Sequence, residues 1–399
     1  EYFVSYYDYY QPEAYVPTRD LYIEKDADIN QEIDRLRLAA TAALMERRDV
    51  IIVATVSCIY GLGSPDLYRA MRVYIDRGSE IDLDDIKRRL VSLQYERNDA
   101  VMERGRFRVR GDTLEIHPAY ANEAYRIELD FDRVARIRKY DPISGAVVAD
   151  DLEEAVVYPA KHFVMPEDQV HKAVDILRAE LDEQYARFLA QNKLLEAQRL
   201  KTRTEYDIEL LTEMGYCPGI ENYSAPLAGR GRGERPGVLL DYFPKDFLTF
   251  IDESHVSVPQ IGAMYAGDRS RKTTLVDYGF RLPCALDNRP LKFEEFESIT
   301  DKVVYVSATP GPFELGRSAT VAEQLIRPTG LVDPELSVRP SEGQMEDIYA
   351  EIRKRIERGE RSLILTLTKR MAEELTEYLS GLSLKVRYIH SEVETIERV

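Results

Sequence analysis

Two adjacent carboxylates at the end of an apolar stretch give the clearest chemical signal in this sequence. Asp252 and Glu253 directly follow the apolar run 247–251, which we predict to be a β-strand. Such a pair at the carboxyl edge of a parallel sheet can hold Mg²⁺ and activate water, as in nucleotide hydrolases. Asp252 would bind Mg²⁺ through water, and Glu253 would orient the attacking water. A solvated acidic pair at a strand end is the plainer alternative.

A second motif later in the chain strengthens the hydrolase interpretation. The β-branched run 302–306 leads into Ser307, Ala308, Thr309 and Pro310. In helicase-like ATPases an Asp-Glu-x-His motif and a Ser-Ala-Thr motif occur in this order. The Ser and Thr hydroxyls then link hydrolysis to the nucleic-acid site. Because each motif here ends a predicted strand, the two patterns support one another and favour an ATPase.

The phosphate-binding loop that such an enzyme needs is missing from the sequence. A P-loop combines two glycines with a lysine and a Ser or Thr, and its backbone amides and lysine hold the phosphates. The nearest match, residues 311–318, has Arg317 in the lysine position and Pro312 inside the loop, so we interpret it as coincidence. The chain also begins at Glu1 rather than at methionine. We therefore expect a piece of a longer protein, with the P-loop upstream.

Residues 1–30 carry a pattern of a different kind. They hold seven acidic residues, two basic residues and seven tyrosines, namely Tyr2, Tyr6, Tyr7, Tyr9, Tyr10, Tyr15 and Tyr22. A segment with this charge does not bind DNA by counterion release. Tyrosine rings can instead stack on bases, at about 1–3 kcal/mol per base, or wedge into a duplex. Turn formers such as Pro12 and Pro17 predict a hairpin or extended ribbon. A tyrosine-rich packed strand is the alternative.

The elements that must position these residues alternate between strands and helices. Besides the two strands named above, we predict a helix at 31–48, a buried strand at 49–55, strands at 361–368 and 385–389, and a helix at 370–379. This alternation indicates parallel βαβ units and hence an α/β fold.

Two stretches interrupt that α/β pattern. Short strands at 105–110, 113–118 and 125–131 indicate an inserted α+β domain over 71–160. Residues 166–214 read as a packed helix or helical hairpin, with an apolar stripe made of Leu177, Leu181, Tyr185, Phe188, Leu189, Leu194, Leu195 and Leu200. We expect a flexible Gly/Arg-rich loop at 228–237 and an interdomain linker at 328–345.

The overall composition narrows the class of protein. The 399 residues include 54 basic and 71 acidic side chains, a net charge of −17, which argues against a wholly basic nucleic-acid-binding surface. Any nucleic-acid contact must therefore be local. Three dispersed cysteines and five dispersed histidines argue against a disulfide framework or a zinc site. Since no membrane span or secretion signal is visible, we expect a reducing, cytoplasmic setting.

Six blocks of sequence point to a known family. They are SYYDYYQPEAYVP at 5–17, TVSCIYGLGSP at 55–65, GIENYS at 219–224, DESH at 252–255, GFRLP at 279–283 and SATPGP at 307–312. Taken in order, they resemble the UvrB family, the damage-verifying subunits of bacterial UvrABC nucleotide excision repair. The resemblance covers nearly the whole chain, and blocks of this length and specificity do not arise by chance.

The resemblance implies a superfamily 2 helicase-like ATPase with parallel sheets and two RecA-like domains. It divides the chain into a tyrosine-rich β-hairpin (1–30), the first RecA-like domain (31–70 and, with a helical insert, 241–328), a UvrA-binding insertion (71–160), a helical DNA-contacting subdomain (161–240) and part of the second RecA-like domain (329–399). Such a protein uses ATP and Mg²⁺, receives damaged DNA from UvrA and recruits UvrC for incision.

The resemblance also assigns roles to individual residues. One DNA strand would pass behind the hairpin, in contact with Tyr6, Tyr7, Tyr9, Tyr10, Tyr15, Tyr22, Arg37, Tyr60 and Arg281. Arg37 would also latch the hairpin. Arg108 and Arg110 fall where the family contacts UvrA, although on their own they read as surface strand charge. The implied catalytic residues are Asp252, Glu253, Ser307 and Thr309.

Two other functions remain open at this point. A UvrB-like docking module of a transcription–repair coupling factor would bind UvrA without hydrolysing ATP, and it would need neither Asp252 and Glu253 nor the hairpin. A processive superfamily 2 helicase would share the ATPase motifs but would not account for the tyrosines. We therefore favour ATP-dependent damage verification by the intact protein. The 399 residues alone are expected neither to hydrolyse ATP nor to complete repair.

Overall fold

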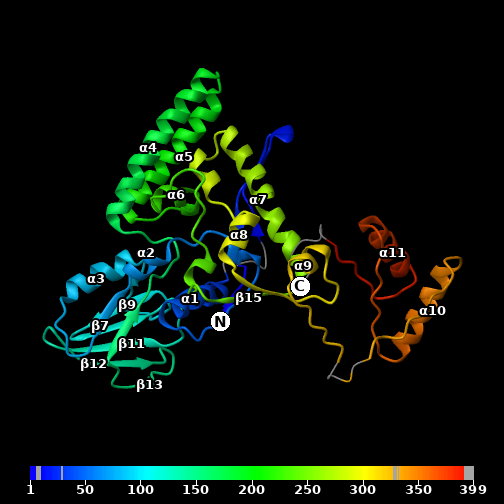
Figure 1. Ribbon diagram of the computed structural model, residues 1–399, viewed down its shortest axis with the longest axis horizontal. Coiled ribbons are helices and arrows are strands. Elements are labelled where there is room, and N and C mark those ends of the chain that lie inside the picture. The colour runs from blue at the N-terminus through cyan, green and yellow to red at the C-terminus, as the bar shows by residue number, and fades with distance from the viewer. Residues whose placement is uncertain (6–9, 28–29, 327–329, 331, 391–399) are drawn as a thin grey trace. The chain divides into compact units, whose positions relative to one another are not determined.

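A computed structural model describes residues 1–5, 10–27, 30–326, 330 and 332–390 of the chain (Figure 1). The chain divides into two compact units, Glu1–Ser318 and Ala319–Val399, which are taken separately below. The larger unit combines helices with parallel and antiparallel strands, so the predicted mixed α/β character is present.

The N-terminal segment joins a short parallel strand pair to one helix. β1 (Tyr2–Phe3) pairs in parallel with β6 (Val53–Ala54). The predicted helix is α1 (Gln31–Glu46), and the Asn30 side chain caps it by accepting hydrogen bonds from two backbone amides. The strand predicted over 49–55 is present only at Val53–Ala54, where it pairs in parallel, and its predicted burial is wrong, since Ile51 is 81% and Val53 is 56% exposed. In the part of the chain that the structure describes, β6 has β1 as its only strand partner.

The tyrosine-rich segment folds back on itself as an antiparallel ribbon. β3 (Ala14–Val16) pairs with β4 (Leu21–Ile23), and β2 (Tyr10–Gln11) pairs with β5 (Asp26–Ala27). A 3₁₀ turn at Pro17–Arg19 connects the inner strands and ends at Asp20, whose φ is 47°. Tyr6, Tyr7 and Tyr9 lie outside the described residues. We call the paired strands β2 to β5 the ribbon.

A six-stranded sheet follows in the chain. Its strand order is β13 (Val147–Ala149), β12 (Arg133–Tyr140), β11 (Ala124–Asp130), β10 (Thr113–His117), β9 (Arg106–Arg110) and β8 (Glu96–Arg97). All neighbours are antiparallel except β8 and β9. The three strands predicted here are confirmed as β9, β10 and β11.

The other elements of this region complete one hydrophobic core with the sheet. They are β7 (Val73–Asp76), α3 (Leu83–Ser92) and β14 (Glu154–Val157), whereas the preceding helix α2 (Pro65–Ala70) places Tyr68 in a different buried cluster, with Phe3 and Tyr158. β7 and β14 form a separate antiparallel pair. Ile86 and Leu90 of α3 belong to the same buried cluster as Phe107, Ile116 and Ile127 of the sheet. Sheet and helix together give the α+β character that the sequence predicted.

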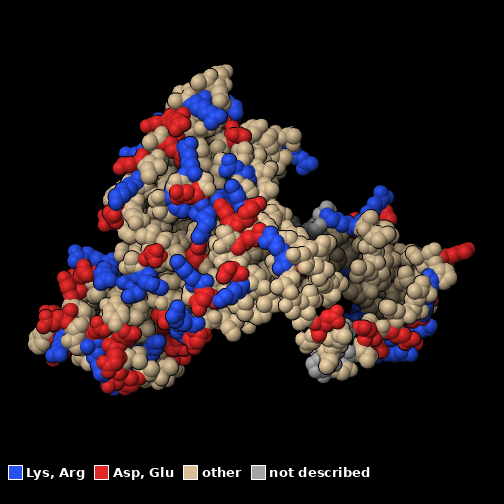
Figure 2. Space-filling view, viewed as in Figure 1, with Lys and Arg blue, Asp and Glu red and all other residues tan. Residues whose placement is uncertain are grey.

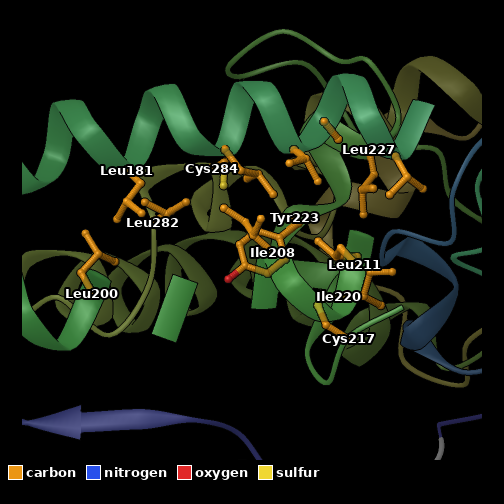
Figure 3. Close-up of a cluster of buried hydrophobic side chains, with 14 of the residues drawn as sticks. Leu181, Leu200, Ile208, Leu211, Cys217, Ile220, Tyr223, Leu227, Leu282 and Cys284 are labelled. Atoms are coloured by element: carbon orange, nitrogen blue, oxygen red, sulfur yellow. The ribbon is translucent and has the colours of Figure 1, made fainter. Parts of the chain in front are cut away.

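Two long helices pack against each other as a helical hairpin, as predicted for 166–214. α4 (Glu167–Ala190) and α5 (Leu194–Met214) share with α6 (Ser224–Leu227) a core that includes Leu181, Leu200 and Tyr223 (Figure 3). The prediction that Leu194 and Leu195 belong to the buried stripe is wrong, since they are 62% and 67% exposed. The helix breaks between residues 190 and 194, so the helical phase on which the stripe depended is not continuous.

The strands that carry the predicted ATPase motifs are both present. β15 (Leu248–Ile251) and β16 (Lys302–Tyr305) pair in parallel, with Ile251 opposite Tyr305. They are accompanied by α7 (Ser254–Asp277), α8 (Phe293–Ile299) and α9 (Pro312–Arg317). In the described residues this pair and the β1–β6 pair are separate two-stranded sheets.

The Gly/Arg-rich segment 228–237 is a loop, as predicted, and hydrogen bonds and an ion pair attach it to neighbouring elements. The backbone amide of Gly233 donates to Asp287 Oδ1 (2.9 Å), and Arg232 pairs with the buried Glu180 (3.1 Å). Arg230 donates to the Ser224 hydroxyl (3.3 Å). The glycines and arginines predicted a loop, but they did not indicate that Asp287 and Glu180 bind it.

In its described residues, the smaller unit has two helices, α10 (Gln344–Glu357) and α11 (Lys369–Gly381). α11 confirms the helix predicted at 370–379. The predicted strands at 361–368 and 385–389 are not formed in the described residues, and Leu363, Leu365 and Leu367 are 88%, 88% and 93% exposed. A lone strand has no ladder partners and is unstable in water, which explains the difference. The boundary between the units lies after Ser318, earlier than the linker predicted at 328–345.

Charge is mixed over the surface. Basic and acidic residues are interspersed on the face shown in Figure 2, as the balance of 54 to 71 suggests. The three cysteines are free. None of the helices in the described ranges is both long and apolar enough to span a bilayer.

Candidate nucleotide and DNA site

The two predicted ATPase motifs meet at the carboxyl end of the β15–β16 pair. Asp252 follows β15 directly, and Glu253 has φ 43° and precedes the first residue of α7. The amide of Ser254 donates to the carbonyl of Val306 (3.0 Å). His255 Nδ1 and Ser307 Oγ form a hydrogen bond of 2.8 Å. The structure thus joins the DESH and SAT segments through one backbone and one side-chain contact.

The donor set at this edge suits a magnesium ion that arrives with phosphates. Asp252 and Glu253 offer two adjacent carboxylates. In the described ranges no cluster of three or more His, Cys, Asp or Glu side chains could hold a metal by itself. Mg²⁺ commonly takes one or two protein carboxylates and completes its shell with water and substrate phosphates. The backbone amide of Thr309 donates to Ser307 Oγ (3.0 Å).

Arg37 contacts Phe3 and Val4, two described residues before the ribbon, which we call the ribbon root. It lies in α1, is 4% exposed, and its Nη1 donates to the carbonyl of Val4 (2.7 Å) and to Ser57 Oγ (3.1 Å). Its guanidinium also stacks over the Phe3 ring at 3.8 Å. This contact set matches the latching role predicted for Arg37 more closely than a freely exposed DNA contact.

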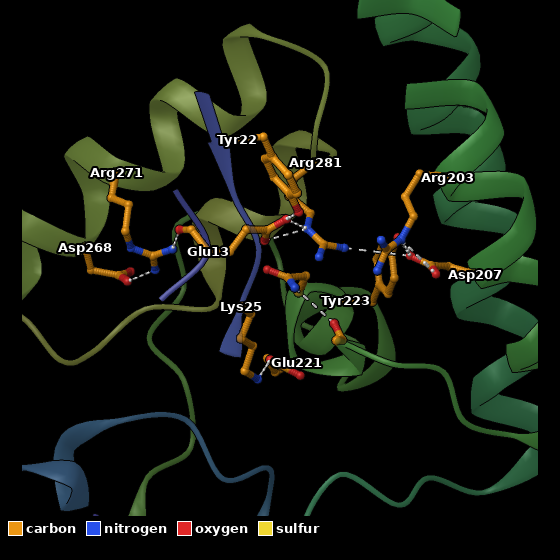
Figure 4. Close-up of polar contacts among 12 residues, drawn as sticks. Glu13, Tyr22, Lys25, Arg203, Asp207, Glu221, Tyr223, Asp268, Arg271 and Arg281 are labelled. Atoms are coloured by element: carbon orange, nitrogen blue, oxygen red, sulfur yellow. Dashed lines mark hydrogen bonds and ion pairs between the residues drawn. The ribbon is translucent and has the colours of Figure 1, made fainter. Parts of the chain in front are cut away.

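Six side chains hold the ribbon against the rest of the larger unit, and we call them the clasp (Figure 4): Glu13, Tyr22, Lys25, Glu221, Arg271 and Arg281. The carboxylate of Glu13 accepts from Arg281 Nε (2.9 Å) and from the Tyr22 hydroxyl (2.5 Å). Arg271 of α7 donates to the Glu13 carbonyl (2.5 Å). Lys25 pairs with Glu221 (2.6 Å).

Burial makes the central ion pair of the clasp a strong constraint. Arg281 and Glu13 are each 7% exposed. Burial alone would lower the pKa of Arg281, but Glu13 outweighs it and raises that pKa. Burial also raises the pKa of Tyr22, and its hydrogen bond to Glu13 raises it further. Removing one partner would leave an uncompensated buried charge, which is costly.

An aromatic contact reinforces the clasp. The Tyr22 ring stacks on Phe280 with centroids 4.5 Å apart and an interplanar angle of 4°. Tyr15 packs on Phe280 (4.8 Å) and on Tyr278 (4.9 Å). The Arg199 guanidinium lies over the same Phe280 ring, 4.0 Å from its centroid. Two of the tyrosines predicted to bind DNA therefore contact protein in this structure.

The remaining predicted residues lie elsewhere in the larger unit. Tyr60 is partly buried in the cluster that includes Ile59, and its hydroxyl lies 3.5 Å from Met264 Sδ. Arg108 and Arg110 are on β9, where Arg108 pairs with the buried Glu115 and Arg110 donates to the Asp99 carbonyl (2.6 Å).

Sequence reasoning missed most of the clasp. Glu13, Lys25, Glu221 and Arg271 were not singled out, because no local pattern shows which of many charges are paired. The only sequence signal was the excess of acidic over basic residues in the tyrosine-rich segment, which indicates that the ribbon needs basic partners elsewhere in the chain. Gly279 is a second missed feature: its φ is 71°, and a Cβ there would lie 2.3 Å from the Glu196 carbonyl oxygen. Glycine thus allows the close turn that presents Phe280 and Arg281.

Comparison with known proteins gives two family matches. Residues 73–163 match the UvrB interaction domain, which contains the six-stranded sheet. Residues 168–229 match the UvrB third helical domain, which contains α5 and most of α4.

Whole-chain relatives carry a consistent name. UvrABC system protein B of Treponema denticola is 66% identical over 399 residues, which is all of this chain and 60% of that protein. The proteins of the same name from Treponema pallidum and Methanothermobacter thermautotrophicus are 64% and 56% identical over 399 residues, or 60% and 62% of their lengths. The chain therefore spans about 60% of the length of these curated relatives.

Proposed function

Because the chain belongs to the UvrB family, we propose that it forms part of a protein that recognises and verifies DNA damage in bacterial nucleotide excision repair. ATP hydrolysis would drive local strand separation around the tyrosine-rich ribbon, which acts as a β-hairpin inserted between the strands. The substrate is damaged DNA received from UvrA, and UvrC is then recruited for incision. Such a protein works on chromosomal DNA in the cytoplasm.

One observation supports the proposal most directly: helix α7 connects the carboxylate pair, where ATP would be hydrolysed, to the ribbon, where DNA would bind. It begins directly after Asp252 and Glu253 and contains Arg271, which bonds the ribbon at the Glu13 carbonyl (2.5 Å). At 1.5 Å per residue, the helix carries a displacement over about 25 Å between these points. A shift at the carboxylates could therefore reach the clasp through one continuous helix, although Pro259 near its start removes one backbone hydrogen bond.

The carboxylate pair would serve the nucleotide end. Asp252 would hold Mg²⁺, which would neutralise charge on the ATP phosphates when bound. Glu253 orients the attacking water, and Ser307 and Thr309 sense the state of the site through the contacts between the SAT loop and the DESH segment. The phosphates also need a P-loop from outside these 399 residues. The chain by itself is accordingly expected to show no ATP turnover.

The ribbon would serve the DNA end. Tyr6, Tyr7, Tyr9 and Tyr10 would stack on bases and test pairing, while Arg37 holds the ribbon root. Tyr22 and Arg281 belong to the clasp and Tyr15 packs on Phe280 beside it, so their contact with DNA would require the clasp to open. Tyr60 would contact the strand at the ribbon root. The β1–β6 and β15–β16 pairs would belong to the first RecA-like domain, and residues 329–399 to the second.

The sheet at 73–163 would dock UvrA. Arg110 is the more available of the two predicted contacts, since Arg108 already pairs with a buried glutamate. The match to the UvrB interaction domain supports this partner. A docking module without ATPase activity would also have the UvrA-binding sheet. It would not need a helix that connects the carboxylate pair to the clasp, as α7 does.

A turnover assay tests the proposal in the chain extended to the full length of its relatives. Glu253→Gln should lower DNA-stimulated ATP turnover at least about 100-fold, because the water loses its orienting base. Glu294→Gln, an exposed acid on the neighbouring helix α8, is the matched control and should keep the wild-type rate. Equal turnover in wild type and Glu253→Gln would contradict the assignment.

A further inference from the structure

Arg281, the central cation of the clasp, lies between two buried carboxylates. Glu13 of the ribbon accepts a hydrogen bond from Arg281 Nε (2.9 Å). Asp207 of α5 lies at the opposite side of the guanidinium, with its Oδ2 3.8 Å from Arg281 Nη1 (Figure 4). Asp207 is 1% exposed, and among the described residues Arg281 Nη1 has no hydrogen-bond partner. Arg281 is therefore hydrogen-bonded to one carboxylate and in a looser ion pair with the other.

The Asp207 carboxylate is held in place and has room for a further donor. It accepts from the Tyr223 hydroxyl (2.6 Å), and Arg203 Nε lies 3.2 Å from each of its oxygens. A carboxylate has about four acceptor sites, so these two donors do not fill it. Hydrogen bonds between ionised groups are about 2.7–2.9 Å long. A shift of Arg281 by about 1 Å would therefore turn its ion pair with Asp207 into a hydrogen bond.

Opening of the clasp would change the charge balance around Arg281. In the closed clasp, the cations of Arg203 and Arg281 are balanced by two carboxylates, one on the ribbon and one on α5. When the ribbon leaves, Glu13 moves into water with it, whereas Arg281 stays behind. A guanidinium that loses its carboxylate while it is still shielded from water is strongly unfavourable. Asp207 can take Glu13's place, because the Arg203 side chain is 38% exposed and water can solvate it instead.

We propose that Asp207 is a positioning residue that allows the ribbon to open, because it accepts the Arg281 guanidinium when Glu13 leaves. The inference rests on the proposed function, in which Tyr22 and Arg281 reach DNA only after the clasp opens, and deepens it by naming the residue that permits opening. Arg281 then changes between two discrete arrangements, one with each carboxylate. In the open arrangement its Nε is released from Glu13 and can donate to a DNA phosphate.

Amide hydrogen exchange in the full-length protein, without DNA or ATP, measures how often the clasp opens. A two-stranded ribbon is marginally stable on its own, so the amides of 14–16 and 21–23 exchange when the clasp releases it. Asp207→Asn keeps an acceptor for Tyr223 but removes the charge that receives Arg281. We expect exchange in these strands to slow at least about fivefold. A merely structural role would give the opposite sign, because a less stable protein exchanges faster.

Arg203→Met provides a second variant at a position that tolerates substitution, since its side chain is 38% exposed. Asp207 then loses its competing cation and binds Arg281 more readily. Exchange in the same strands should become at least about threefold faster than in wild type. The two variants therefore shift the same amides in opposite directions.

Glu209→Gln, which removes an exposed acid from the same helix, is the matched control and should exchange at the wild-type rate. Exchange in Asp207→Asn that is unchanged or faster than in wild type would overturn the inference and make Asp207 a structural residue. Exchange in Arg203→Met that is no faster than in wild type would also overturn it. Because the measurement contains neither DNA nor ATP, its failure is distinguishable from failure of the turnover assay that tests the proposed function.

Discussion

His162 shows how a single buried side chain links the ribbon root to pH. It is 8% exposed, lies 3.2 Å from Thr41 Oγ1, and packs edge-on against Phe3. Burial, with a smaller effect from Arg37, lowers the pKa of His162 to about 3. The unfolded chain binds a proton near pH 6.5 and the folded chain does not, so stability falls as the pH drops below about 6.5.

We predict how steeply the free energy of unfolding falls with pH because of His162. Between about pH 6.5 and pH 4, the wild type should lose about 1.4 kcal/mol of unfolding free energy per pH unit more than His162→Gln, which cannot titrate. Urea unfolding at several pH values measures the difference. His171→Gln, at a histidine whose side chain is 58% exposed, is the control and should follow the wild type. Parallel curves for wild type and His162→Gln would contradict the argument.

Phe131 shows a local conflict between residue type and backbone. It occupies the turn between β11 and β12 with φ 57° and is 91% exposed. A bulky residue pays about 1–2 kcal/mol in this left-handed region, whereas glycine pays only its backbone entropy.

Phe131→Gly should therefore stabilise the protein by about 0.5–1 kcal/mol, measured as a higher urea unfolding midpoint. Ile143 is a matched control because it is 97% exposed in another turn and its φ is not positive. Ile143→Gly should be neutral or destabilising. A lower midpoint for Phe131→Gly would mean that the ring makes a stabilising contact that its exposure does not reveal.

At the scale of elements, the ribbon is held by charges on segments that are far apart in sequence. Lys25 of the ribbon arm and Glu221 are 2.6 Å apart, with side-chain exposures of 42% and 27%. A pair this exposed contributes at most about 1 kcal/mol, enough to change local opening about fivefold.

Reversing either charge of the Lys25–Glu221 pair should make local opening of the ribbon more frequent, and exchanging the two charges should restore the wild-type behaviour. Lys25→Glu and Glu221→Lys should each speed amide hydrogen exchange of residues 21–27 about fivefold, because like charges then face each other. The Lys25→Glu/Glu221→Lys double variant should return to the wild-type rate. Arg47→Glu, which breaks the exposed Arg47–Asp49 pair on another segment, should leave these amides unchanged. Exchange in the double variant as fast as in the single variants would show that this pair does not hold the ribbon.

The elements also show what sequence could predict. Local patterns were enough for α1, α11, β9 to β11, β15 and β16, because periodicity and turn residues act within a few positions. They failed at 361–368, where a strand depends on partners that the described residues do not supply. They also failed at Leu194 and Leu195, where a break at 190–194 changes the helical phase.

The candidate site divides in the same way at the scale of the whole molecule. The position of Asp252, Glu253, Ser307 and Thr309 after two paired strands was predictable, because each motif is short and follows an apolar run, whereas their catalytic role stays a prediction. The clasp was not predictable, since Glu13 and Arg281 are 268 positions apart and nothing local marks them as partners. The connection through α7 can be recognised only when the positions of the carboxylate pair and of the clasp are both known. The placement of both motifs on α7 is the basis for the proposal that hydrolysis at one end of this helix controls the ribbon at the other.

The most direct test of this account uses the full-length chain, a UvrA-type loader and ATP. Stable complexes are compared on lesion-bearing and undamaged duplexes, with wild type, Tyr9→Ala/Tyr10→Ala, and Tyr206→Ala as a control at an exposed tyrosine on α5. The account predicts lesion-selective complexes for wild type and the control, and their loss in the double variant. Lesion-selective complexes that persist in Tyr9→Ala/Tyr10→Ala would contradict it and place damage sensing outside the ribbon.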